Sequence, residues 1–247
     1  MIHTSGTGIL AFADLERNIF GEASSKIYDD WEGVGEITAL PDHAPHHNFD
    51  KIILDVGTKD PSKVKTAIVC PPCIYGTGRG PGNQRSIQIP DLVKCTLETK
   101  VGIQVGEGKS YWNNVHVNDL SDCYLKLIEA AVDGGGKATW GKDGYYFTEN
   151  GEHAWGDVAK AIATASHEQG FIPADDVVAM SGDDANQLRS YGALLWGSNS
   201  RGRALRARKL LGWSPKGNAI NDEIPEAVSI EAKTLGLVQG HASKVSG

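Results

Sequence analysis

Residues 113–136 constrain the fold most, because a short apolar run in this segment leads directly into a helical stripe. Residues 113–117 predict a strand, and Asn118 is a residue type that caps helix starts. The stripe has the spacing of one helix face and consists of Leu120, Tyr124, Leu127, Ile128 and Ala131. Gly134 follows it, as expected at a helix end. A strand that runs directly into a helix is typical of α/β proteins.

Strand and helix patterns alternate over the rest of the chain as well, and the 30 glycines of the sequence are spread between the apolar segments. Further strands are predicted at residues 65–69, 102–105 and 145–148. Further helices are predicted at residues 46–56, 87–97, 155–165 and 201–211. The apolar face of helix 46–56, the pattern of a core-facing stripe, consists of Phe49, Ile52, Ile53 and Val56. We therefore expect an α/β fold.

Composition limits the functional class. A chain of 247 residues with 40% hydrophobic residues can form one large domain or two small ones. Its net charge of -7 argues against nucleic-acid binding, which usually requires a basic surplus. No apolar run approaches the roughly 20 residues that cross a bilayer, and the first residues lack the pattern of a signal peptide. We therefore expect a cytoplasmic protein whose 4 cysteines are free thiols.

Cys70 and Cys73 have the spacing of a redox disulfide or of half a zinc site. A redox pair needs its first cysteine at a helix start, whereas this pair runs into the helix-breaking sequence IYGTGRGPG. Zinc would need further ligands, for which a polar cluster is the candidate source: Asp42, His43, His46 and His47. We favour two small residues that flank a turn at Pro71 and Pro72, with a redox or metal protein as an alternative.

A glycine-rich run follows the cysteines at residues 76–82. It does not match the dinucleotide-binding pattern GxGxxG, because Pro81 stands where the third glycine should be. The run also fails to connect a strand directly to a helix, so a flexible substrate loop is predicted. No P-loop, HExxH or GxSxG pattern occurs in the sequence.

Ser5, His47 and Lys51 are the candidate catalytic side chains. Ser5 lies at a predicted strand end, and the other two lie four residues apart on one helix face. Such a set can polarise a carbonyl and pass a proton, although a turn-forming serine and a solvated helix face are the alternative. A basic run can bind a diphosphate or carboxylate, or can be a solvated helix face, and consists of Arg201, Arg203, Arg206, Arg208 and Lys209.

Four motifs occur in an order that carries a family resemblance. They are HTSGTG at residues 3–8, VCPPCIYGTG at 69–78, YWNNVHVNDLSDCYLKLIEA at 111–130 and LRARKLLGWSPK at 205–216. Together they resemble the C-terminal half of an extended short-chain dehydrogenase/reductase of the NAD-dependent epimerase/dehydratase family. The resemblance covers residues 2–237 and implies a partial Rossmann-type parallel sheet with a smaller C-terminal substrate-binding lobe.

The resemblance also implies residue roles. Ser5 takes the position of the catalytic serine or threonine that orients the substrate oxygen. The sequence HHNFDK aligns with the YxxxK pair of the family, so that His47 replaces the acid/base tyrosine and Lys51 holds the cofactor ribose. The residues expected against the nicotinamide are Pro72, Cys73 and Ile74. Those expected on the substrate side are Tyr75, Arg79, Arg85 and Arg201.

The first half of the family pattern, with its glycine-rich cofactor loop, has no counterpart in this sequence. The resemblance therefore implies a remnant of the NAD(P)-binding domain at residues 1–76 and a substrate-binding lobe with interleaved Rossmann elements at 77–247. In the sheet order 3-2-1-4-5-6, loss of the first four strands leaves the strand at residues 2–4 at an edge. We expect a truncated chain that binds NAD or NADP weakly alone and forms a homodimer or pairs with a complementing chain.

The resemblance thus predicts an NAD(P)-dependent epimerase, dehydratase or reductase that acts on a small hydroxyl or carbonyl substrate. A catalytically inactive remnant or interaction module of the same family is the first alternative. A CxxC redox or metal protein is the second.

Overall fold

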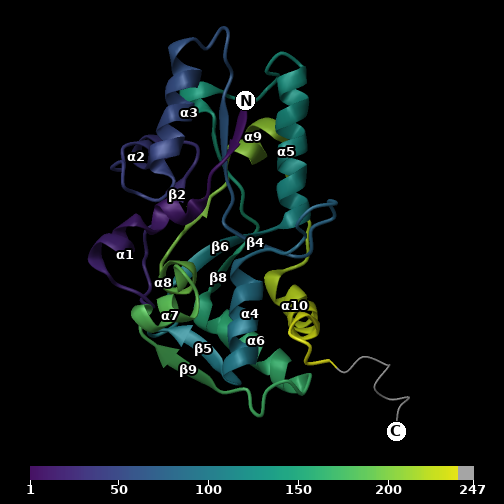
Figure 1. The fold of residues 1–247 in the computed structure, drawn as a ribbon. Coiled ribbons are helices and arrows are strands. Elements are labelled where there is room, and N and C mark those ends of the chain that lie inside the picture. The colour runs from purple at the N-terminus through teal and green to yellow at the C-terminus, as the bar shows by residue number, and fades with distance from the viewer. Residues whose placement is uncertain (239–247) are drawn as a thin grey trace.

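The structure is a computed structural model that describes residues 1–238, and it confirms the α/β class. A parallel sheet in the order β1-β3-β7 forms from β1 (Ile2–Thr4), β3 (Ala67–Cys70) and β7 (Tyr145–Phe147). All residues of β3 and β7 are buried, as expected of strands covered on both faces. In Figure 1 this sheet lies between α3 (His47–Lys59) and α5 (Val117–Val132), and β1 is its edge.

Three further sheets build the rest of the molecule. The first contains β4 (Cys73–Tyr75), β6 (Tyr111–His116) and β8 (Glu152–Ala154), with β4 parallel and β8 antiparallel to β6. The second pairs β5 (Gly102–Val105) with β9 (Val177–Met180). The third pairs β2 (Tyr28–Asp29) with β10 (Gly202–Arg203).

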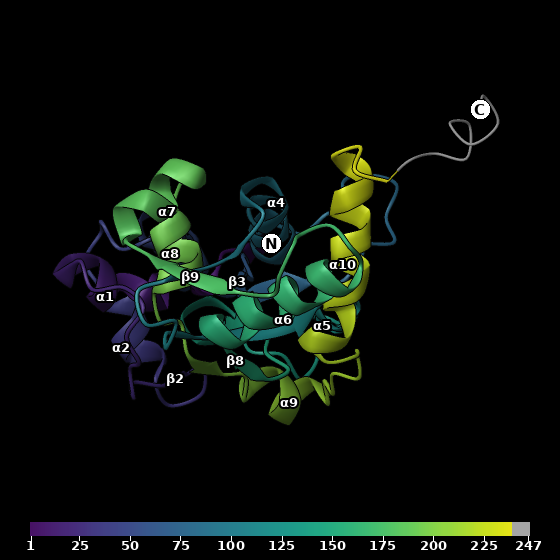
Figure 2. The same cartoon turned by 90° about the horizontal axis from the view of Figure 1, so that it is seen from below.

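Three long helices build the lobe around the β4-β6-β8 and β5-β9 sheets: α4 (Gln88–Thr99), α6 (Trp155–Glu168) and α10 (Ile220–Thr234). They pack against one another, and Figure 2 shows α6 beside α10. The short helices are α1 (Phe12–Arg17), α2 (Val34–Thr38), α7 (Gly182–Leu188), α8 (Gly192–Gly197) and α9 (Arg206–Leu211), with 3₁₀ turns at Thr7–Ala11 and Gly141–Asp143. Through residue 238, every helix is too short or too polar to cross a bilayer.

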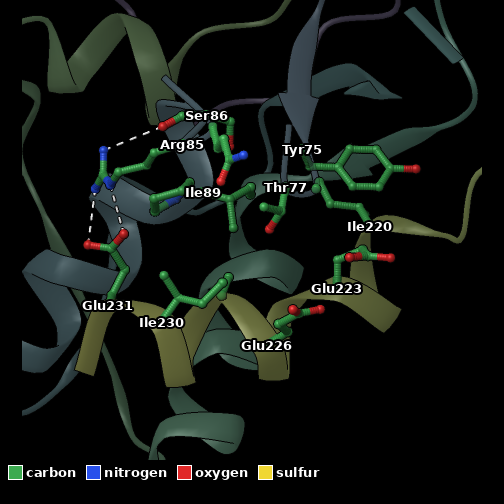
Figure 3. Close-up of a pocket in the computed structure, with 14 residues that line it drawn as sticks. Tyr75, Thr77, Arg85, Ser86, Ile89, Ile220, Glu223, Glu226, Ile230 and Glu231 are labelled. Carbon is green, nitrogen blue, oxygen red and sulfur yellow. Dashed lines mark hydrogen bonds and ion pairs between the residues drawn. The ribbon is translucent and has the colours of Figure 1, made fainter. Parts of the chain in front are cut away.

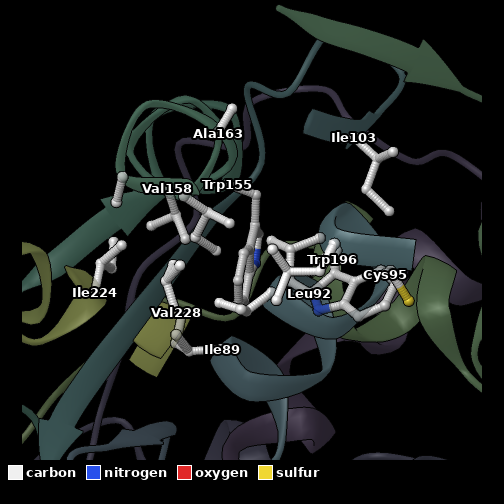
Figure 4. Packing of buried hydrophobic residues seen from close by; sticks show 14 of the residues in the cluster. Ile89, Leu92, Cys95, Ile103, Trp155, Val158, Ala163, Trp196, Ile224 and Val228 are labelled. Atoms are coloured by element: carbon white, nitrogen blue, oxygen red, sulfur yellow. The ribbon is translucent and has the colours of Figure 1, made fainter. Parts of the chain in front are cut away.

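Two hydrophobic cores hold the fold together. One lies around the β1-β3-β7 sheet and includes Ile68, Val69 and Tyr145. The other lies under α4, α6 and α10 and is built around Trp155 and Trp196 (Figure 4). Both cores contain residues from each side of position 76, so residues of the two predicted units, 1–76 and 77–247, pack together in each core. The last nine residues of the second unit lie outside the described chain.

The structure confirms most of the predicted elements, but the apolar stripe of helix 46–56 is only partly correct, because Ile53 packs against the core of the main sheet and the other three residues do not. Phe49, Ile52 and Val56 are 62%, 59% and 41% exposed, so they do not face the core. The face of α3 that packs on the sheet instead carries His47, Asp50 and Gly57. Polar contacts made by Asp50 orient the helix in this way, and the hydrophobic pattern does not reveal them.

Two helix starts also differ from the prediction. The cap of α5 is His116, whose Nδ1 accepts a hydrogen bond of 3.1 Å from the backbone N–H of Asn118. The basic helix predicted at 201–211 is helical only from Arg206 to Leu211, because Gly202–Arg203 pairs with β2 as a strand.

Candidate active site

A cavity of about 1050 Å³ opens between the two cores at the carboxyl ends of β1 and β3. One wall is formed by Ser5–Gly8, which follow β1, and by Pro71 and Pro72, which follow β3. The other wall is formed by α8 and the start of α4. Ligands of open α/β sheets bind in a crevice at the carboxyl ends of the strands. This cavity is therefore the candidate active site.

A buried hydroxyl–carboxylate cluster lies behind this wall. The Ser5 hydroxyl donates a hydrogen bond of 2.9 Å to Oδ2 of Asp50, and the Tyr145 hydroxyl donates one of 2.8 Å to the same oxygen. These residues come from β1, α3 and β7, so the parallel sheet brings them together. Burial, together with Cys70 and Asp50, raises the pKa of Tyr145 well above its usual value, so the tyrosine remains a donor.

The setting of the Asp50 carboxylate is unusual. Asp50 is 1% exposed, and its Oδ1 has no hydrogen-bond partner among residues 1–238. The Nε2 atom of His3 lies 3.7 Å from this oxygen, beyond hydrogen-bond distance. Burial of a carboxylate is unfavourable in free energy unless the group is paired, and a buried polar atom without a partner points to a functional role. Asp50 is therefore a candidate proton acceptor that contacts the cavity through Ser5.

His46 supplies the second polar group of the cavity wall. It lies in the left-handed region with φ +65°, immediately before α3, and lines the cavity. Its ring lies against the turn after β1, since a Cβ atom on Gly6 would stand 3.1 Å from His46 Nε2. Burial lowers the pKa of His46, which favours the neutral ring.

The turn after β1 also has the glycine spacing of a dinucleotide-binding pattern, which was not identified from the sequence. Residues 6–11 read GTGILA, which matches the dinucleotide pattern G-x-G-x-x-A after a strand. The His46 ring covers Gly6 and Gly8, and the following Thr7–Ala11 segment is a 3₁₀ turn. This turn therefore holds a histidine side chain and does not present the open helix start that a pyrophosphate requires.

The structure places the two predicted helix residues away from the cavity. His47 is 1% exposed and buried beside the sheet, and its Nε2 has no partner in the described chain. Lys51 lies on the surface and pairs with Asp42. Positions 46 and 50 face the strand ends, whereas the predicted pair was 47 and 51. A shift of one residue turns a helix face by about 100°.

Of the residues expected against the nicotinamide, Pro72 and Ile74 line the large cavity, whereas Cys73 is fully buried in the core behind it. On the substrate side, Arg85 lines the large cavity. Arg79 and Arg201 do not contribute to its walls.

The basic run near the C-terminus is engaged within the fold. Arg201 forms a bidentate pair with Glu152 at 2.7 and 2.8 Å. Arg206 donates from Nε to the backbone oxygen of Asp30 at 2.8 Å. These side chains fix β10 and α9 in place, so the diphosphate role considered for them from the sequence has no support in their positions.

A second cavity of about 250 Å³ lies between the loop after β4, α4 and α10 (Figure 3). Tyr75 lines it and donates a hydrogen bond of 2.6 Å from its hydroxyl to the backbone oxygen of Asn218. Arg85 lines it as well, and its Nε and Nη2 atoms lie 2.7 and 3.2 Å from the Glu231 carboxylate. This pair ties the glycine-rich loop to α10.

The two cysteines of the CxxC motif lie at the end of β3 and the start of β4, both fully buried. Burial raises the pKa of each thiol far above its usual value, the opposite of what a redox-active cysteine needs. Within residues 1–238, no group of three or more His, Cys, Asp and Glu side chains is arranged to hold a metal ion. The positions of Cys70 and Cys73 thus contradict the redox alternative.

We expect native protein to react slowly with Ellman's reagent, because all 4 cysteines are buried and free. Desolvation raises the pKa of Cys95 to about 11 and that of Cys123 to about 12, so these thiols also resist ionisation. Denaturant should release all 4 thiols at once. Fast reaction of a thiol pair in the native protein would contradict this burial.

The fold is similar to that of solved epimerases and dehydratases that act on nucleotide sugars. UDP-glucose 4-epimerase from Thermotoga maritima, solved with UDP-glucose, matches with a TM-score of 0.59 and 14% identity over 95% of this chain and 63% of that chain. DesIV, a dTDP-glucose 4,6-dehydratase from Streptomyces venezuelae solved with NAD, matches with a TM-score of 0.62 and 14% identity over 96% and 61%. The chain spans less than two thirds of either protein, and the likeness establishes the fold.

No family model matches the chain. A relative from Acremonium sp., the oxidase ucsJ, is 40% identical over 244 residues, which cover 96% of this chain and 70% of the relative. At this identity and coverage, the chain belongs to the family of that oxidase.

Proposed function

We propose that the chain forms the hydroxyl- and carbonyl-handling part of an NAD(P)-dependent oxidoreductase. The observation that carries the proposal is made at Ser5, which lines the cavity and whose hydroxyl donates to the buried Asp50 carboxylate. The name of the 40% identical relative, an oxidase, supports oxidoreduction over epimerisation or dehydration. In this proposal Ser5 binds the substrate oxygen, and Asp50 acts through Ser5 as a positioning residue and proton acceptor.

The proton path follows from the hydrogen bonds. Because Ser5 donates its own proton to Asp50 Oδ2, its oxygen is free to accept a proton from a substrate hydroxyl. As the substrate C–O bond becomes a carbonyl, the hydroxyl proton moves to Ser5 Oγ and the serine proton moves to Asp50. Reduction of a carbonyl reverses both transfers. His46, neutral because burial lowers its pKa, can orient the substrate oxygen from the cavity wall.

The residues present fit the nicotinamide end of the cofactor. Pro71, Pro72 and Ile74 form an apolar wall beside Ser5 at the carboxyl ends of the strands. The cavity volume of about 1050 Å³ is at the upper end of the usual range for ligand pockets, so it leaves room for a substrate beside the ring. A bound NAD(P)⁺ would supply the acceptor for the hydride that leaves the substrate carbon.

Replacement of Ser5 by alanine tests the proposal. We expect Ser5→Ala to lower kcat for NAD(P)⁺-dependent oxidation of alcohols by about 10²-fold or more, since the proton path loses its first member. Formation of reduced nicotinamide is the readout. The matched control is Ser62→Ala, because the Ser62 hydroxyl also donates to a carboxylate, that of Asp60 at 2.6 Å, but on the exposed surface. Equal turnover by both variants would contradict the role of Ser5.

A noncatalytic interaction module remains the second candidate, because Lys51 pairs with Asp42 outside the cavity and holds no ribose there. The same assay separates the two candidates. An interaction module would show no cofactor-dependent turnover with any alcohol or carbonyl compound, whereas the oxidoreductase requires it in the wild-type protein.

A further inference from the structure

The cavity continues from Ser5 and His46 toward the lobe, and its walls become apolar there. The side chains that form this part come from segments far apart in the sequence: Phe20, Ile74, Trp112, Tyr191, Leu194 and Leu195. Trp112 is fixed by a hydrogen bond of 2.9 Å from its Nε1 to the backbone oxygen of Ser198, so its ring is a rigid part of the wall. The cavity that Ser5 and His46 line thus has an apolar part, which we call the chamber, beside polar residues that include Gln88, Asn186 and Ser190.

The charges along the chamber balance one another. Arg85 directs its Nε and Nη2 to Glu231 and its Nη1 to Asp91 at 2.8 Å, which occupies all three nitrogens. Arg189 pairs through Nε with the other oxygen of Asp91. Both carboxylates are buried and serve as fixed partners for the two arginines. Among the described cavity residues, these arginines and His46 are the basic side chains, and no lysine joins them.

A substrate diphosphate in the chamber would therefore find no surplus of positive charge, whereas the cofactor of the proposed function would place only its nicotinamide end there, at the uncharged wall of Pro71, Pro72 and Ile74. The substrate diphosphate would have to take the arginines from their carboxylates and leave Asp91 and Glu231 buried without partners, which is unfavourable. A neutral molecule disturbs none of these pairs and gains from contact with the apolar walls. The solved epimerase relative of this fold, in contrast, holds the nucleotide sugar UDP-glucose.

We propose that the cavity selects a neutral, largely apolar alcohol or carbonyl compound and excludes nucleotide sugars. This inference rests on the proposed function, because it names the substrate class of the same site. The polar end of the ligand lies at Ser5 and His46, and its apolar body lies along Trp112, Leu194 and Leu195.

Displacement of the neutral dye Nile red tests the inference without turnover. We expect 1-decanol to displace the dye from the wild-type protein and UDP-glucose to leave it bound. The comparison needs no substitution, so it holds whether or not variants fold. Displacement of the dye by UDP-glucose, or tight UDP-glucose binding in calorimetry that Arg189→Gln abolishes, would overturn the inference.

Two variants locate the dye. Leu195→Glu places a charge on the apolar wall and should weaken Nile red binding by about tenfold or more. Ile52→Glu makes the same kind of change on the exposed face of α3, where Ile52 is a competing apolar site, and should leave the affinity unchanged. Thermal melting confirms that each variant is folded. If Ile52→Glu alone weakens binding, the dye occupies α3 and the inference fails.

Ser5→Ala distinguishes this inference from the proposed function. The variant removes the proton path but keeps the apolar walls, so 1-decanol should still displace Nile red from it. Displacement without cofactor-dependent turnover in the wild-type protein would contradict the proposed function and support the apolar cavity. Cofactor-dependent turnover of UDP-glucose would support the proposed function and contradict the selection of an apolar substrate.

Discussion

Asp50→Asn is expected to lower kcat for alcohol oxidation by about 10²–10⁴-fold, the range typical of a lost general base. Asparagine keeps the size of the side chain and can still accept hydrogen bonds from Ser5 and Tyr145, which lie 2.9 and 2.8 Å from Oδ2. It cannot take up the proton that leaves the substrate through Ser5. The substitution therefore removes the proton acceptor and preserves the contacts that orient α3.

The effects on kcat and KM separate this role from a structural one. Asp50→Asn should lower kcat and leave the KM for the alcohol close to the wild-type value, because the contacts of the side chain with Ser5 and Tyr145 are kept. The control is Asp60→Asn, which changes an exposed carboxylate that also accepts from a serine hydroxyl. Its turnover should equal that of the wild type. An Asp50→Asn variant with an unchanged kcat and only a raised KM would show that Asp50 supports the fold and not the proton transfer.

The sequence predicts the position of Ser5 but not its carboxylate partner. A serine after a strand is visible from local pattern, and the structure places Ser5 in the cavity wall. Asp50, in contrast, lies in an amphipathic helix among polar residues, where a carboxylate is ordinarily solvated. Its contact with Tyr145 spans 95 residues of sequence and exists only because β1, β3 and β7 are neighbours in the sheet. The spacing of residues along the chain does not predict which strands are neighbours in the sheet.

His46 was missed for a related reason. An alignment on the YxxxK spacing selects residues 47 and 51, and the pair at 46 and 50 has the same spacing. What decides between them is the rotation of α3, which the His46 conformation with φ +65° and the hydrogen bonds of Asp50 determine. The exposed Phe49, Ile52 and Val56 show that the hydrophobic pattern alone gives the wrong rotation for this helix.

Elements with a strong local pattern were predictable. The strand at Gly102–Val105 has the predicted bounds, and α6 begins at the predicted Trp155. The long helix α10 was not predicted, and Pro225 within it is a local signal against a helix interior. Pro225 lies in the first turns of the helix, and packing of Ile224, Val228 and Ala232 into the lobe core stabilises the segment. Tertiary burial thus outweighs the local signal.

Trp155→Ala should lower the free energy of unfolding by about 3–5 kcal/mol, the range for loss of a large buried aromatic side chain. Trp155 is 1% exposed and is the first residue of α6, and its ring packs in the lobe core with residues of α4 and α10 (Figure 4). Its ring also makes a perpendicular contact with His153, with 4.6 Å between centroids. A typical domain is stable by about 5–15 kcal/mol, so this single cavity removes a large share of the total.

Trp155→Phe provides the decisive comparison. The indole Nε1 of Trp155 has no hydrogen-bond partner among the described residues, so phenylalanine removes a buried unsatisfied donor while it keeps most of the apolar contact. We expect a loss of only about 1–2 kcal/mol in urea unfolding, and Val132→Ala, at a position that is 84% exposed, should change it by less than about 0.5 kcal/mol. If phenylalanine were as destabilising as alanine, the indole N–H would have to be bonded in solution, and the lobe core would contain a polar contact that its packing does not show.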